Sequence, residues 1–114
     1  MDLHALSAVV GRLGDGECPW TREQTAEDLI HYLRKEIIEV EEVLRKQRKQ
    51  KAGGSCELAA ELVGELGDVL FDALLLIRVC ERDLAGVSLT KICESANQKL
   101  RRRCPYMFLS LIHI

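Results

Sequence analysis

The chain has 114 residues, of which 47% are hydrophobic and 30% are charged; this balance is typical of one globular domain and too apolar for a disordered segment. The net charge of −2 argues against a protein whose main task is to hold nucleic acid phosphates. No apolar run approaches the roughly 18–20 residues that a membrane helix needs, and the N-terminus carries no secretion signal, so we expect a cytoplasmic protein without nucleic acid or membrane partners.

The first expected helix covers residues 2–13. Its apolar residues recur at three- and four-residue steps and form one stripe: Leu3, Leu6, Val9, Val10 and Leu13. Turn residues occupy positions 14–19 and predict a break there. A second helix is expected to run to about residue 51 from Thr25, which can cap its N-terminus together with Asp28.

The third expected helix, residues 56–83, is the most apolar part of the chain. Between residues 69 and 77 it is apolar nearly all round, so it must be buried on several sides. A fourth helix is expected over 89–103, with Ser88 as its N-cap and Pro105 just beyond its end. The five cysteines form no C-x-x-C pair and fit reduced thiols better than disulfides or a zinc site.

Four helices of this size predict an all-α, four-helix-bundle-like fold for residues 1–108. Because helix 56–83 carries apolar residues nearly all round, we expect a homodimer or larger even homo-oligomer that shares this helix. A central helix inside a compact monomer is the alternative. The last six residues, 109–114, follow Phe108 without a cap or charge pattern and match a translated reading frame of a transposon-adaptor end used for sequencing libraries. We therefore interpret them as an assembly artefact and expect the native gene to continue differently after Phe108.

Two pairs of acids stand at helical spacing: Glu36 with Glu39, and Glu65 with Asp68. Residues three apart project from one face of a helix, so two packed helices would bring four carboxylates together. Like charges so placed cannot all stay ionised without compensation. A hard divalent cation with oxygen ligands supplies that compensation, so we predict that the four residues bind Mg²⁺, with Mn²⁺ as a substitute.

A less specific interpretation of the acids stays open. They could face solvent and pair with cations such as Arg34, Lys35 or Arg78, as isolated acidic pairs often do. Asp72 stands one turn after Asp68 and is a weaker candidate, which we assign only as an outer group of the site.

The acidic pairs belong to a longer series of motifs. E-I-I-E at 36–39 and E-L-G-D at 65–68 resemble the E-x-x-E and E-x-x-D signature of MazG-type nucleoside triphosphate pyrophosphohydrolases. Further segments, within about residues 6–108, are similar to motifs of that family in the same order: G-E-C-P-W-T-R-E-Q-T at 16–25, A-N-Q-K-L-R-R-R at 96–103 and C-P-Y-M-F at 104–108. Ordered motifs with matching spacing are a more specific signal than the acids alone.

The resemblance implies an all-α MazG fold and the hydrolysis of a nucleoside triphosphate between its α and β phosphates. The products would be a nucleoside monophosphate and pyrophosphate, a reaction that cleans the nucleotide pool. The residues implied as catalytic metal ligands are Glu36, Glu39, Glu65 and Asp68. The residues implied for substrate binding are Asn97, Lys99, Arg102 and Trp20.

Three positions depart from the family pattern: Lys35 replaces a glutamate, and Cys104 and Tyr106 replace histidines. Cations near the end of 89–103 could merely complement the helix dipole, and Trp20 could anchor its loop in the core. Two other functions stay open: a non-catalytic helical dimerisation module, and a pyrophosphohydrolase of another substrate such as phosphoribosyl-ATP. No motif predicts the base preference.

Overall fold

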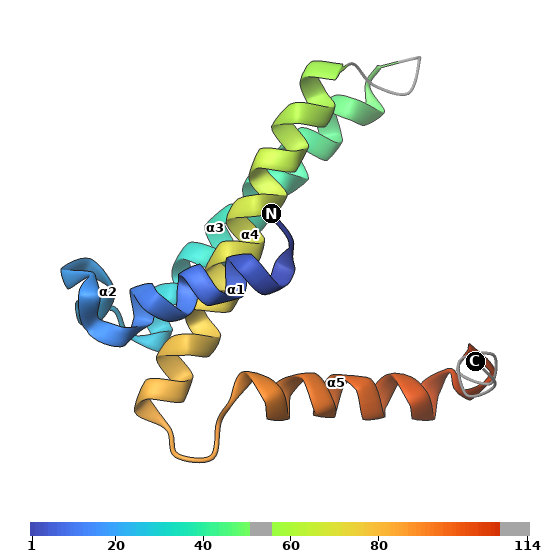
Figure 1. Ribbon diagram of the computed structural model, residues 1–114. Coiled ribbons are helices and arrows are strands. Elements are labelled where there is room, and N and C mark those ends of the chain that lie inside the picture. Colours follow the sequence, from blue (N-terminus) through green and yellow to red (C-terminus); the bar gives the residue numbers. More distant parts are fainter. Residues whose placement is uncertain (51–55, 108–114) are drawn as a thin grey trace.

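The computed structural model describes residues 1–50 and 56–107, and the regular elements within these ranges are all helical (Figure 1). In chain order they are α1 (Leu3–Arg12), the π-helical segment η1 (Leu13–Glu17), α2 (Pro19–Glu23), α3 (Ala26–Arg48), α4 (Cys56–Asp83), α5 (Leu89–Arg103) and the 3₁₀ turn η2 (Pro105–Met107). The all-α prediction is therefore confirmed. The interpretation of residues 109–114 falls outside the described residues.

Side-chain caps determine where α3 and α5 begin. At the start of α3, the Thr25 N–H donates to Asp28 Oδ2 at 2.9 Å and the Asp28 N–H donates to Thr25 Oγ1 at 3.2 Å, a reciprocal capping box. At the start of α5, Ser88 Oγ accepts from the Lys91 N–H at 3.2 Å. Both caps satisfy backbone donors that a helix N-terminus otherwise leaves free, and both were predicted from the sequence.

The segment between α1 and α3 is more ordered than the turn predicted for residues 14–19. The chain continues from α1 into η1 and turns at Gly16, whose φ of 89° lies in the region that favours glycine. Pro19 then occupies the first turn of α2, where its fixed φ suits a helix and its missing N–H costs nothing. The predicted break is confirmed by the kink at Gly16 and the extended backbone of Cys18, and residues 19–23 add a short helix that the turn residues did not indicate.

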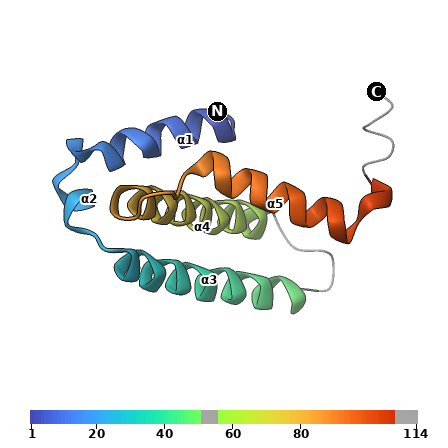
Figure 2. The same cartoon turned by 90° about the horizontal axis from the view of Figure 1, so that it is seen from below.

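Helices α3 and α4 form an antiparallel hairpin, and α1 packs across its lower half (Figure 1). Seen from below, α4 lies between α1 and α3 (Figure 2). The core is small and sits where these three helices meet; its members are Val10, Leu29, Leu75 and Val79. Burial of this cluster fixes the rotation of α4, so the face of α4 that carries Leu75 and Val79 points inward.

The rest of α4 is not covered within the protomer. Val63, Leu66 and Leu70 follow one another at three- and four-residue steps and are 70%, 48% and 41% exposed. The burial expected of residues 69–77 is met except at Leu70, whereas the part of α4 before them is exposed along one face. The shared homodimer and its alternative, a monomer with a central helix, both stay predictions.

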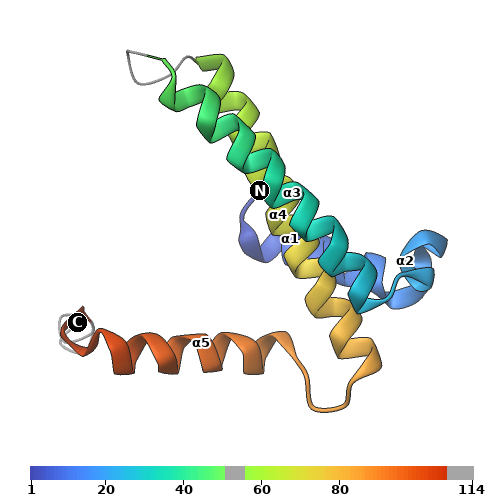
Figure 3. The ribbon, with the colours of Figure 1, turned by 180° about the vertical axis from the view of Figure 1, so that it is seen from behind.

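Helix α5 turns away from the hairpin at the lower end of α4 (Figures 1 and 3). None of its residues is buried, and among the described elements it packs only against α4 and the short η2 turn. The Cα radius of gyration is 17.5 Å, compared with about 13 Å for a compact domain of this length. No helix in the described part of the chain is long and apolar enough to cross a membrane.

Candidate metal centre

Four carboxylates converge halfway along the hairpin. Glu36 and Glu39 project from α3, Glu65 and Asp68 project from α4, and one oxygen of each lies within 4.8 Å of the others. The i,i+3 spacing places each pair on one helical face, and the antiparallel packing of α3 against α4 turns the two faces toward each other. The structure thus brings together the four residues that the sequence predicts as ligands.

The carboxylates strongly perturb one another. Oε2 of Glu36 and Oε2 of Glu65 are buried and have no hydrogen-bond partner in the described structure. Burial, followed by the charges of Glu39, Asp68 and Asp72, raises the pKa of Glu36 to about 7. The side-chain hydrogen bond with Glu39, followed by burial, raises the pKa of Glu65. Carboxylates this close together disfavour one another's charged forms, and a bound cation would relieve that repulsion.

None of the ion pairs among residues 1–50 and 56–107 reaches the four carboxylates of the cluster. Among the described residues, the ion pair nearest in sequence joins Lys46 to Glu61 at 3.3 Å, one turn before Glu65. Arg78, a possible partner of the acids, pairs with Asp15 and Glu81 instead. The donor set is four carboxylates, two of which have a buried oxygen without a partner. Such a set fits a hard divalent cation such as Mg²⁺ or Mn²⁺ and is unlike the nitrogen and sulfur ligands typical of zinc.

The structure corrects the burial expected of Asp68. Asp68 directly precedes the stretch 69–77 that is expected to be buried on several sides, yet it is exposed in the protomer, as is Gly67. The buried acid is Asp72, which is 8% exposed. The sequence signal was its register, because residues 72, 75 and 79 share the face of α4 that points to the core.

The residues implied for substrate binding fall into two groups. Trp20 on α2 is half-exposed, and its ring centroid lies 6.1 Å from that of Tyr32, one turn before Glu36. Asn97, Lys99 and Arg102 are exposed on α5, which does not pack against α3. Within one chain, Trp20 therefore lies against the helix that carries Glu36 and Glu39, whereas the α5 residues do not.

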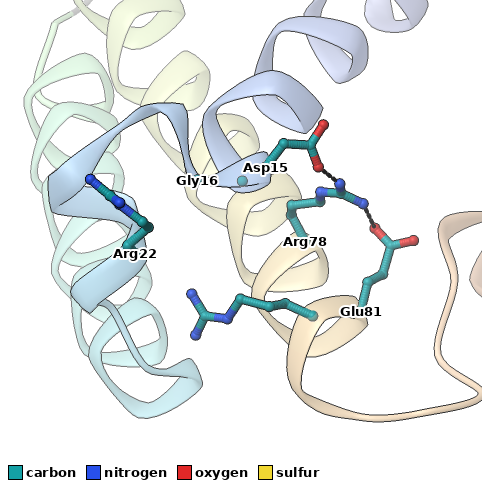
Figure 4. Close-up of a pocket in the computed structure, with 7 residues that line it drawn as sticks. Asp15, Gly16, Arg22, Arg78 and Glu81 are labelled. Carbon is teal, nitrogen blue, oxygen red and sulfur yellow. Dashed lines mark ion pairs between the residues drawn. The ribbon is translucent and has the colours of Figure 1, made fainter.

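A second charged cluster lies at the far end of α4 (Figure 4). Five charged residues line a cavity of about 480 Å³ there: Asp15, Arg22, Arg78, Glu81 and Arg82. The Arg78 guanidinium lies between Asp15 and Glu81 and bonds both, with the Glu81 contact at 3.6 Å (Figure 4). Arg78 packs so closely on Gly14 that a Cβ at that position would collide with its side chain.

Arg82, the other arginine of α4 in this cluster, forms hydrogen bonds to the C-terminal end of α2. Its guanidinium donates to the carbonyl oxygens of Thr21 at 3.3 Å and Gln24 at 2.8 Å, and it also binds the Asp83 carboxylate. A cation at a helix C-terminus satisfies carbonyls that have no helical partner. Two of the three arginines are thus occupied in fastening η1 and α2 to α4, a role that sequence reasoning missed because the partners are about sixty residues apart.

Comparisons with known proteins agree with this architecture. The family model described as "MazG nucleotide pyrophosphohydrolase domain" matches residues 24–108. The chain is 30% identical over 105 residues to a nucleoside triphosphate pyrophosphohydrolase of Escherichia coli strain K12, covering 90% of this chain and 36% of that protein. It is 27% identical over 95 residues to the Bacillus subtilis uncharacterized protein YabN, covering 83% of this chain and 17% of that one.

A solved structure is similar along nearly the whole chain. The crystal structure of a mazG-related protein from Thermotoga maritima aligns with a TM-score of 0.77 and 31% identity, covering 94% of this chain and 83% of that one. The chain spans only about a third of the length of the E. coli relative. The family match, the shared fold and the motif order agree, and the chain belongs to the MazG nucleotide pyrophosphohydrolase family.

Proposed function

We propose that this protein is a Mg²⁺-dependent nucleoside triphosphate pyrophosphohydrolase that releases a nucleoside monophosphate and pyrophosphate. The observation that carries the proposal is the convergence of Glu36, Glu39, Glu65 and Asp68 without a basic partner in the described structure. Family membership and the name of the E. coli relative support the same reaction class. We infer that the reaction serves to clean the cytoplasmic nucleotide pool.

The four carboxylates would hold one or more Mg²⁺ ions, with Mn²⁺ as a substitute. When bound, the ion neutralises phosphate oxygens and favours attack by water. In the reaction, water forms a bond to the α phosphorus while the bond from that phosphorus to the bridging oxygen breaks. A cluster carboxylate accepts the proton of the attacking water, and pyrophosphate leaves. Trp20 offers a half-exposed ring beside Tyr32, one turn before Glu36, on which a base can stack.

We further propose that the active unit is a homodimer or larger even homo-oligomer. The protomer leaves an apolar face of α4 exposed and sends α5 away from the hairpin. A second copy that covers this face could place its own α5 over the acidic cluster. Asn97, Lys99 and Arg102 would then meet the polyphosphate, for which a lysine and a forked guanidinium are suited.

The test is pyrophosphate release from a panel of ordinary and modified nucleoside triphosphates, measured with Mg²⁺ and with a chelator. We expect release that requires the metal and that is lost in a Glu39→Gln variant. Release from no triphosphate with either Mg²⁺ or Mn²⁺ would contradict the proposal. Phosphoribosyl-ATP belongs in the same panel, because release from it alone would indicate the other pyrophosphohydrolase reaction, and no release at all would favour a dimerisation module.

A further inference from the structure

Asp72 is the charged side chain that α4 buries most deeply in the described structure. It is 8% exposed, and its Oδ2 atom is buried without a hydrogen-bond partner among the described residues. It stands one turn after Asp68, so it projects from the same side of α4 as that carboxylate. The residue therefore lies between the acidic cluster and the core.

The position is close to the cluster and yet outside it. Asp72 is not among the four residues whose oxygens lie within 4.8 Å of one another. Burial, followed by the charge of Asp68, nevertheless raises the pKa of Asp72, and the charge of Asp72 contributes in turn to the raised pKa of Glu36. Its place one turn after Asp68 and outside this set of four makes Asp72 a buried neighbour of the cluster rather than one of its ligands.

The packing of the protomer gives no reason for a carboxyl group here. A buried polar atom without a partner destabilises the fold, and an apolar residue of similar size at the same position would not. Mg²⁺ binds proteins through few carboxylates and keeps several waters, and the hydrogens of these waters need acceptors. Acceptors behind the ligands commonly set the affinity of a metal site.

We propose that Asp72 is a positioning residue of the cation site, whose inward oxygen accepts a hydrogen bond from the hydration water of the bound ion. This inference rests on the proposed function, because it requires that the four carboxylates bind Mg²⁺. It adds a fifth acidic residue that sets how tightly the site holds its ion. The fold itself does not need the carboxylate.

The test compares Asp72→Leu and Asp72→Asn with the wild type. Glu61→Gln is the matched control, since Glu61 flanks the cluster one turn before Glu65 on the same helix but is exposed and paired with Lys46. Mg²⁺ affinity is measured by titration calorimetry, the Mn²⁺ environment by electron paramagnetic resonance, and stability by the melting temperature without metal.

We expect Asp72→Leu to weaken Mg²⁺ binding about 10–100-fold and to change the Mn²⁺ spectrum. Its melting temperature without metal should stay level or rise. Asp72→Asn keeps one acceptor oxygen, so its Mg²⁺ affinity should lie between those of Asp72→Leu and the wild type. If the leucine variant does not fold, the affinity of Asp72→Asn tests the proposal. Glu61→Gln should bind Mg²⁺ nearly as the wild type does.

Two results would overturn the assignment. Wild-type affinity in both Asp72 variants would show that the ion does not depend on this acceptor. An equal loss of affinity in Glu61→Gln would show that only total charge matters. If the wild type itself binds no Mg²⁺, both this inference and the proposed function fail, whereas the first two results leave the proposed function intact.

Discussion

Helices α3 and α4 each hold two carboxylates of the cluster at positions where the charges of the other three disfavour ionisation. The backbone fixes the side chains of Glu36 and Glu65 with one oxygen buried and unpartnered. Such preorganisation lowers the stability of the protein without metal. Binding of a cation to the folded state restores that stability. Single-residue changes in the cluster should therefore affect stability and turnover in opposite directions.

Replacement of Asp68 tests this opposition directly. Asp68→Asn keeps the size of the side chain and removes one negative charge, so turnover should fall by roughly a hundredfold or more through weaker metal affinity and weaker neutralisation of phosphate charge. The melting temperature without metal should hold or rise, because repulsion among the acids is relieved. Both quantities are measured on the same sample. Near-wild-type turnover with a lowered melting temperature would show that Asp68 has a structural role instead.

The titration of Glu36 predicts how stability depends on pH. Its pKa is about 7 in the folded chain and 4.5 for an ordinary glutamate, so between these values the folded state binds more protons than the unfolded state. Stability without metal should therefore fall as pH rises through this window, and the protein should melt higher at about pH 5.5 than at about pH 7.5.

Mg²⁺ should change this pH dependence, because the ion binds the deprotonated carboxylates. The increase in melting temperature on adding millimolar Mg²⁺ should grow with pH over the same window. Thermal melts at several pH values, with and without the ion, check both statements. A Mg²⁺-induced increase that stays constant across the window would contradict the coupling of protons and metal at this site.

At the scale of elements, α2 depends on contacts that reach across the chain. It has only five residues, and a helix this short is not stable alone. The guanidinium of Arg82 on α4 holds its C-terminal carbonyls, and Arg78 beside it holds η1 through Asp15. Trp20 is therefore positioned by α4, although it lies far from α4 in sequence.

Two glycines of the first segment give a matched test of this junction. In Gly14→Ala the new Cβ would lie 3.0 Å from Arg78 Cδ and closer still to Cγ, so the arginine must leave its carboxylates and we expect a loss of about 1–3 kcal/mol in unfolding free energy. Gly11→Ala meets nothing within 4 Å, and a helical alanine should gain up to about 1 kcal/mol. Urea denaturation compares them. Equal stability of the two variants would mean that the junction does not constrain Arg78.

At the scale of the whole molecule, a single chain leaves part of its apolar surface exposed. The exposed side chains of Val63, Leu66 and Leu70 lie along α4, and α5 lacks a buried face. Light scattering should therefore report a dimer or a larger even assembly, because apolar surface of this extent is covered in water by association. A Leu70→Lys variant should shift the equilibrium toward the monomer. A wild-type monomer at micromolar concentration would contradict the prediction.

Mixed oligomers test whether α5 works on the neighbouring protomer. Glu39→Gln removes a ligand, Arg102→Ala removes a cation of α5, and each variant alone should be nearly inactive. If α5 acts across the interface, a dimer of one copy of each contains one intact site, so an equal mixture should recover up to about a quarter of wild-type turnover. If α5 acts within its own chain, no mixed dimer contains an intact site and the mixture stays inactive.

Local patterns in the chain were enough to predict the long helices, the caps at Thr25 and Ser88, and the pairing of acids three residues apart. These features depend on neighbours within a turn or two, and such interactions are written directly in the order of residues. The order and spacing of the motifs were also enough to indicate the family. The sequence could not tell that Asp68 is exposed while Asp72 is buried, because the rotation of α4 depends on which face packs against α1 and α3.

Tertiary structure alone decided the remaining features. It made residues 19–23 a helix through Arg82, it took Arg78 away from the acidic cluster, and it separated α5 from the hairpin that carries the acids. These outcomes depend on contacts between residues tens of positions apart, whose free energy competes with local preference and leaves little trace in periodicity. The four carboxylates lie together because the packing of α3 against α4 brings their two faces into contact. Only that packing could show that no ion pair of the described residues involves them.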